Sequence, residues 1–178
     1  MLPGVDLAKA KSIYGVDNPD KIQEYEGKAK MTAYMEAVHR MNNCLGICHY
    51  NTIWGNLDLI DLPQMAELYS SATGWETSVE DLKRMAERQL NLEKALNLRF
   101  TNFDRKDDMP TPRDLSEPIP TGPAAGWKMD PEKYNGMLDE YYDIHGWDRE
   151  TSYPKRQTLV DLGLESVADD LEKIGKLR

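Results

Sequence analysis

The spacing of apolar residues along the chain predicts a succession of amphipathic helices. Between residues 24 and 41, apolar side chains recur at steps of three and four positions, which places them on one face of a helix. These side chains are Met31, Tyr34, Met35, Val38 and Met41. The pair Asn42 and Asn43, followed by Gly46, predicts where this helix ends.

Two further helices are predicted before residue 100. Asp61 and Pro63 mark the start of a helix that runs through residues 64–69 and stops at Gly74. A capping-box pattern over residues 77–80 starts the next helix. Its apolar stripe, expected to face the core, consists of Leu82, Met85, Ala86, Gln89, Leu92, Glu93 and Leu96. Gln89 and Glu93 are the polar members of the stripe, and one or both of them need a buried partner.

The helical period disappears between Phe100 and Trp127 and returns after residue 130. Prolines too frequent for a helix or a central strand interrupt this stretch, at Pro110, Pro112, Pro118, Pro120 and Pro123. Asp130 then caps a helix that ends at His145 and Gly146. A last helical pair is predicted at residues 156–162 and 165–174.

These elements predict an all-α protein of five to seven helices with negligible strand. The expected architecture is a multihelical, orthogonal or bundle-like domain that includes a long proline-rich irregular segment. Residues 1–23 show no sustained period and are interpreted as an irregular lead-in to a helical domain at 24–178. Within the charge run 104–108, we expect Arg105 or Asp107 to make a fixed salt bridge.

Composition narrows the function classes. The 178 residues carry a formal net charge of -9, which argues against sequence-independent nucleic-acid binding, because a basic surface supplies most of that affinity. No apolar run reaches the roughly 18 residues that a membrane span needs. The N-terminus shows no signal-peptide pattern. We therefore expect a cytoplasmic protein with reduced thiols and no nucleic-acid or membrane partner.

Both cysteines of the chain fall within residues 44–48, around Gly46 and just after the first predicted helix. A thiolate at a helix-to-loop junction suits a soft metal centre such as an iron–sulfur cluster, but such a cluster normally takes four cysteines. The run is therefore either an ordinary turn, with Cys48 a small buried hydrophobe, or one edge of a site completed elsewhere. Core packing is the default expectation for Cys44. A thiol redox pair is disfavoured, because redox dithiols usually have Cys-X-X-Cys spacing.

The three histidines give no metal-site signal of their own. His39 on the first helix is expected to be solvated or satisfied by a partner. His49 adjoins Cys48 and could hydrogen-bond near a cluster, but no second histidine has the spacing of a metal site. His145 lies at a helix C-terminus, where a protonated imidazole suits the helix dipole.

Six short stretches occur in an order that resembles the C-terminal part of the tungsten-containing aldehyde ferredoxin oxidoreductase family. They are Asn43-Cys44-Leu45-Gly46-Ile47-Cys48 and residues 67–75, 105–108, 137–142, 146–148 and 159–164. The resemblance covers roughly residues 24–164. In that family an N-terminal domain forms the base under a tungsten bis-pterin, and two helical domains close over it.

The resemblance implies that this chain is close to the last of those domains. Cys48 falls on the fourth ligand of a [4Fe–4S] cluster whose other three cysteines come from the middle domain. Asn43 and Ile47 fall on pterin-contact positions. The family usually has an aspartate at the position of Asn43, and asparagine keeps an acceptor oxygen but loses the charge.

The implied function is the oxidation of aldehydes to carboxylic acids, with ferredoxin as the electron acceptor. We expect the N-terminal and middle domains as partners, no activity from this chain alone and no cofactor bound to it. Leu45, Ile47, Ile53 and Trp54 are expected to form an apolar face beside Cys48 through which the chain self-associates or binds a partner. The alternative is a non-catalytic helical interaction module that retains the fold. It is distinguished by whether a partner chain supplies three cysteines and the pterin-binding domain.

Overall fold

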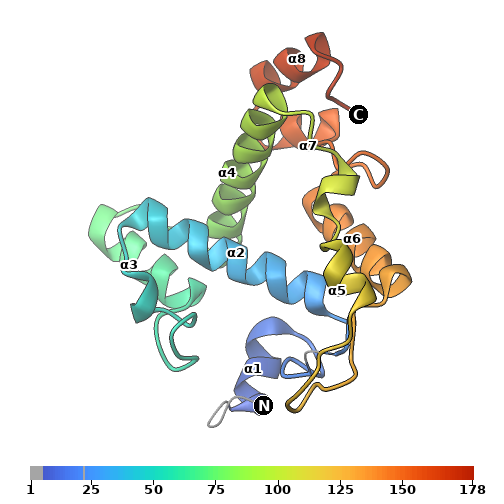
Figure 1. Ribbon diagram of the computed structural model, residues 1–178. Coiled ribbons are helices and arrows are strands. Elements are labelled where there is room, and N and C mark those ends of the chain that lie inside the picture. The colour runs from blue at the N-terminus through green and yellow to red at the C-terminus, as the bar shows by residue number, and fades with distance from the viewer. Residues whose placement is uncertain (1–5, 22) are drawn as a thin grey trace.

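Eight α-helices and two 3₁₀ helices make up the part of the chain that the computed structural model describes, residues 6–21 and 23–178 (Figure 1). They are α1 (Leu7–Tyr14), α2 (Lys28–Leu45), η1 (His49–Asn51), α3 (Leu62–Thr73), α4 (Val79–Phe100), η2 (Arg105–Asp108), α5 (Pro112–Ser116), α6 (Pro131–His145), α7 (Arg156–Asp161) and α8 (Glu165–Lys173). Within these ranges there is no strand, only two isolated β-bridges. The predicted all-α class is confirmed. None of the helices in the described part is long and apolar enough to span a membrane.

Eight α-helices are one more than the expected maximum of seven, and the two that lie outside the predicted helical ranges, α1 and α5, are short. The prediction of an irregular lead-in is wrong for α1, which starts where the Asp6 side chain accepts a hydrogen bond from the Lys9 amide at 3.1 Å. Its residues Ala10 and Tyr14 are buried in the same core as α2. α5 likewise forms inside the proline-rich stretch, with Pro112 at its first position. Neither of these helices, of eight and five residues, shows a sustained hydrophobic period in its sequence.

Helix α4 connects three separate groups of buried side chains. Leu82 and Ala86 pack in a core formed with α1, α2 and α3. Leu90 packs with residues of α6 and with the nearby Trp147. Leu98 packs with α7 and α8. Figure 1 shows the same arrangement, with α4 rising from beside α2 towards α7 and α8.

The predicted apolar stripe of α4 is only partly correct: Leu82 and Ala86 are buried, but the rest of its apolar residues are not. Met85, Leu92 and Leu96 are 45 %, 48 % and 57 % exposed, because the buried side of the helix turns as it passes from one core to the next. Of the polar pair on that face, Glu93 has a largely buried partner, the Arg40 side chain, which is 12 % exposed. The Gln89 amide donates to the Glu93 carboxylate at 3.2 Å, and the contact lies at the surface.

A buried histidine joins the three helices α2, α4 and α6. His145, the last residue of α6, is 2 % exposed, and its Nδ1 lies 2.9 Å from Glu87 Oε2. Its Nε2 lies 3.5 Å from Glu36 Oε2, which also accepts a 2.9 Å hydrogen bond from the Tyr141 hydroxyl. Burial lowers the pKa of His145, but the two facing carboxylates raise it by more, so the net shift is upward. Burial raises the pKa of Glu36, and its contacts with His145 and Tyr141 more than reverse that change. His145 and Glu36 are therefore both held in their charged forms.

Arg105 fixes the proline-rich crossing to α6. Its guanidinium lies 2.6 Å from Asp139 Oδ1 and donates to Asn135 Oδ1 at 2.9 Å. The predicted salt bridge of Arg105 is thus confirmed. Asp107 acts locally instead, because its carboxylate accepts from the Asp104 amide at 2.9 Å and caps η2.

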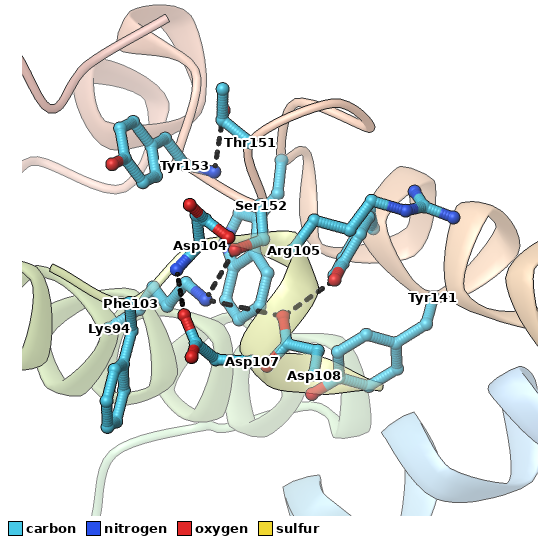
Figure 2. A network of polar contacts seen from close by, with 12 residues as sticks. Lys94, Phe103, Asp104, Arg105, Asp107, Asp108, Tyr141, Thr151, Ser152 and Tyr153 are labelled. Carbon is cyan, nitrogen blue, oxygen red and sulfur yellow. Dashed lines mark hydrogen bonds and ion pairs between the residues drawn. The ribbon is translucent and has the colours of Figure 1, made fainter. Parts of the chain in front are cut away.

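A second buried contact, at Lys94, holds the same crossing against α4. Figure 2 shows the Lys94 amino group pointing towards Ser152 and Asp108, to which it lies at 3.0 Å and 3.9 Å. Burial lowers the pKa of Lys94, and Asp108 opposes this shift. The Tyr142 hydroxyl donates to the same Asp108 carboxylate at 2.6 Å. Ser152 is fully buried with φ of 62°, in the left-handed region that few non-glycine residues adopt.

Two leucines of α4 test the corrected orientation of the helix. Leu98 is fully buried and Leu96 is 57 % exposed. Leu98→Ala should lower the free energy of unfolding by about 2–5 kcal/mol, because it leaves a cavity in the core. Leu96→Ala, the matched control, should change it by no more than about 0.5 kcal/mol. Urea unfolding followed by circular dichroism measures both. Equal losses would contradict the observed orientation.

His145 predicts how stability depends on pH. Because its folded pKa is raised, its stabilisation is complete below the unfolded pKa of about 6.5 and is lost as pH rises through the folded pKa. The free energy of unfolding should therefore fall as the pH rises above about 6.5. His145→Gln should flatten this slope, whereas His39→Gln, at an exposed site, should leave it unchanged. A slope that persists in the His145 variant would assign the pH dependence to other groups.

Candidate functional site

The cysteine run lies at the end of α2, where the chain reverses direction. The helix continues to Leu45, slightly further than predicted, and ends at Gly46 with φ of 69°. Ile47 then turns back, with its amide donating to the Asn42 carbonyl at 2.9 Å. Cys48 follows as the N-cap of η1. The predicted helix-to-loop junction is therefore present.

Both thiols of this run are exposed and free. The expectation that Cys44 packs in the core is wrong. Its Sγ donates to Gln89 Oε1 of α4 at 3.2 Å, because Met41 and Leu45 already occupy the inward side of the last turn of α2. Cys48 is also exposed, so it is not the small buried residue that an ordinary turn would contain.

The neighbouring residues face in different directions. Asn43 is exposed and lines a cavity along α2, whereas Ile47 is half-buried and packs against the core. The predicted apolar face beside Cys48 is only partly present. Trp54 is 51 % exposed, but Ile53 is a core residue at 3 % and Leu45 is half-buried. Turning Ile53 inward completes the core under the loop.

A buried asparagine fixes the loop from below. Asn42 is 1 % exposed, and its amide nitrogen lies 3.0 Å from His49 Nδ1 and 3.3 Å from Thr52 Oγ1. Because the amide donates, His49 Nδ1 accepts, which assigns the imidazole as neutral with its proton on Nε2. Partial burial lowers the pKa of His49, and the nearby His39 lowers it further, which agrees with that assignment.

Aromatic rings cover the surface next to the thiol. The ring of His49 lies 4.7 Å from His39 and 4.2 Å from Trp54, and Tyr50 packs edge-on against Trp54 at 5.4 Å. We call these four residues the aromatic patch. Sequence reasoning did not find it. The only signal was that His39 lies one helical turn before Asn43, and spacing could not show that η1 folds back onto that turn.

A cavity of about 660 Å³ runs along α2 on the side of Asn43. Its wall is charged as well as apolar, and its residues are Lys28, Met31, Thr32, Met35, Glu36, His39, Arg40, Asn43, Trp54 and Glu93. The Arg40 guanidinium donates to Glu93 Oε2 at 3.1 Å, and its buried Nε has no partner among the described residues. Arg40 and Asn43 both line the cavity, where their polar side chains can form hydrogen bonds with a polar ligand.

Cys48 is suited to hold one corner of a metal cluster. In the described part of the chain, no three histidine, cysteine or acidic side chains lie close enough together to hold a metal ion. An iron–sulfur cluster takes thiolate ligands, and an exposed cysteine on a fixed loop can supply one of them. A cluster bound at Cys48 would draw its remaining ligands from outside this set of residues. Asn43 is the neighbouring side chain that can contact an organic cofactor.

The chain is similar to known proteins over most of its length. Residues 4–164 match the family described as "Aldehyde ferredoxin oxidoreductase, domains 2 & 3". The tungsten-containing aldehyde ferredoxin oxidoreductases of Pyrococcus abyssi and Pyrococcus furiosus are 30 % and 29 % identical over 78 % of the chain. The chain spans only about a fifth of their length, 21 % and 22 %. The "Aliphatic sulfonate oxidoreductase, WOR-like subunit" of Pyrococcus furiosus is 27 % identical over 96 % of the chain and 26 % of its own length.

A solved structure shares the fold. It is described as the active site complex BamBC of benzoyl coenzyme A reductase with 1,5-dienoyl-CoA, and it superposes with a TM-score of 0.68 at 25 % identity. The likeness covers 87 % of this chain and 22 % of that one. The family match also begins at residue 4, earlier than the sequence resemblance, and so includes α1. This chain belongs to the aldehyde ferredoxin oxidoreductase family.

Proposed function

We propose that this chain acts as the C-terminal helical part of a tungsten-dependent aldehyde:ferredoxin oxidoreductase and supplies the fourth thiolate of a [4Fe–4S] cluster through Cys48. The observation that carries the proposal is the accessible Cys48 sulfur on a loop fixed by Asn42, inside the stretch that matches the family. A thiol with a structural role alone is usually buried. An accessible one at the end of a helix is available to a metal.

Asn43 and Ile47 are proposed as pterin contacts. The Asn43 carboxamide lies on the cavity along α2 and can both donate and accept hydrogen bonds. The Ile47 side chain packs into the core, so a contact at this position would use its backbone. Arg40, one turn before Asn43 on the same cavity wall, adds a cationic donor.

In this proposal the tungsten pterin supplies the oxidation of an aldehyde to a carboxylic acid, and the cluster carries electrons on to ferredoxin. The residues of this chain position and shield those groups. The loop at Cys48 holds a sulfur at a fixed place, and the aromatic patch limits water beside it. The neutral His49 adds no charge near the thiolate. The partners are the pterin-binding and three-cysteine domains, and the proposed location is the cytoplasm.

A non-catalytic helical module is the second candidate. The specific observation in its favour is Asn43, because the resemblance puts an aspartate there and asparagine lacks its charge. Such a module would keep the helices and the loop but would not require Cys48. The two candidates therefore differ in what happens when that sulfur is removed.

The two cysteines provide a matched test. In the enzyme assembled with its pterin-binding and three-cysteine domains, Cys48→Ala should abolish the four-iron cluster, because one of its thiolates is lost. Iron analysis and electron paramagnetic resonance of the reduced protein measure this. Cys44→Ala, at the other exposed thiol, should retain about four irons per enzyme. Full cluster content in both variants would favour the non-catalytic module.

The chain purified without those domains should contain no stoichiometric iron. A single thiolate does not hold a four-iron cluster. Metal analysis of the purified chain checks this expectation. About four irons per chain would mean that Cys48 finds its other ligands in a way this proposal does not describe.

A further inference from the structure

Four large apolar side chains form an exposed row along α4. They are Met85, Leu92, Leu96 and Phe100, and they are 45 %, 48 %, 57 % and 77 % exposed. Steps of seven and four residues return to nearly the same side of a helix, so the row follows the helix axis. At a rise of 1.5 Å per residue, it extends for about 22 Å.

The contacts among the described residues leave the row exposed. On one flank, Arg84 and Arg88 donate to backbone carbonyls of residues 161–163, which secures α4 to the turn after α7. On the other flank, Glu93 pairs with Arg40 of α2 at 3.1 Å. Both flanks are occupied by contacts within the chain, and the apolar side chains between them remain open to solvent. Contiguous apolar surface of this kind usually marks an interaction site.

The row is continuous with the cysteine run. Gln89 lies within it, between Met85 and Leu92, and accepts the hydrogen bond from Cys44 Sγ at 3.2 Å. Cys44 is in the last turn of α2, and the loop that carries Cys48 follows directly. A protein that brings three further thiolates to Cys48 therefore approaches the surface on which the row begins.

We propose that this α4 row docks against the cluster-carrying part of the same enzyme. The inference rests on the proposed function and adds the surface through which the parts assemble. The relatives carry about four-fifths of their length outside the matched stretch, which provides a partner large enough to cover the row. The row carries no charge, so the partner surface that fits it is apolar. Exclusion of water at such an interface protects its core side chains.

Hydroxyl-radical footprinting with mass spectrometry tests the proposal in the assembled enzyme. Met85 and Phe100 should be oxidised readily in the chain alone and about fivefold more slowly in the enzyme, because docking excludes water from them. The double variant Leu92→Gln, Leu96→Gln should remove this protection without changing the thermal unfolding of the chain alone. The matched control is Leu68→Gln, at a 53 % exposed leucine on α3, which should leave the protection intact.

Each other result overturns the inference. Equal oxidation of Met85 and Phe100 in the chain alone and in the enzyme would show that the row stays open. Protection that is already present in the chain alone, and that disappears on dilution, would assign the row to a second copy. Cys48→Ala separates this inference from the proposed function. If that variant loses the cluster while the row is unprotected in the wild-type enzyme, only the docking surface is wrong. If it keeps the cluster, the proposed function itself fails.

Discussion

The fold depends on α4, which contributes side chains to all three hydrophobic cores. α4 contributes Leu82 to the core with α2 and α3, Leu90 to the core with α6, and Leu98 to the core with α7 and α8. Among the described residues, these three cores have no other helix in common. The position of α2, and with it the loop that carries Cys48, is therefore set by how α4 packs. A change in how α4 packs in one core therefore also shifts the side chains that it contributes to the other two.

Buried charge makes this arrangement specific. His145 lies between Glu36 of α2 and Glu87 of α4, so three helices meet at one imidazole. Desolvating such groups is costly, and a buried ion pair is weak evidence for net stability. The ion pairs of His145 disfavour alternative folds more strongly than they stabilise this one. Any other packing of α2 against α4 leaves a buried charge without its partner. The cavity wall that presents Asn43 is thus held at a defined distance from α6.

Sequence reasoning found the helices whose ends are marked by local chemistry. Asp61 and Asp130 cap α3 and α6 as predicted, each accepting from backbone amides there. The capping box of α4 is formed by Ser78 and Asp81, one residue after the predicted pattern at 77–80. Sequence reasoning missed α1, whose sequence shows no sustained period. It also placed Met85, Leu92 and Leu96 of the α4 row in the core, for a different reason. Periodicity shows which positions share a face of a helix, but it does not show whether this chain or another protein covers that face.

The candidate site likewise has features that the local sequence predicts and others that it does not. The exposed Cys48 follows from a helix end at Gly46, which is local and visible in the sequence. The aromatic patch and the contacts of His145 depend on pairings between distant segments, which spacing alone does not specify. The open sulfur and the open α4 row nevertheless share one explanation. We interpret the exposed apolar row and the exposed Cys48 thiol as surfaces adapted to a larger assembly.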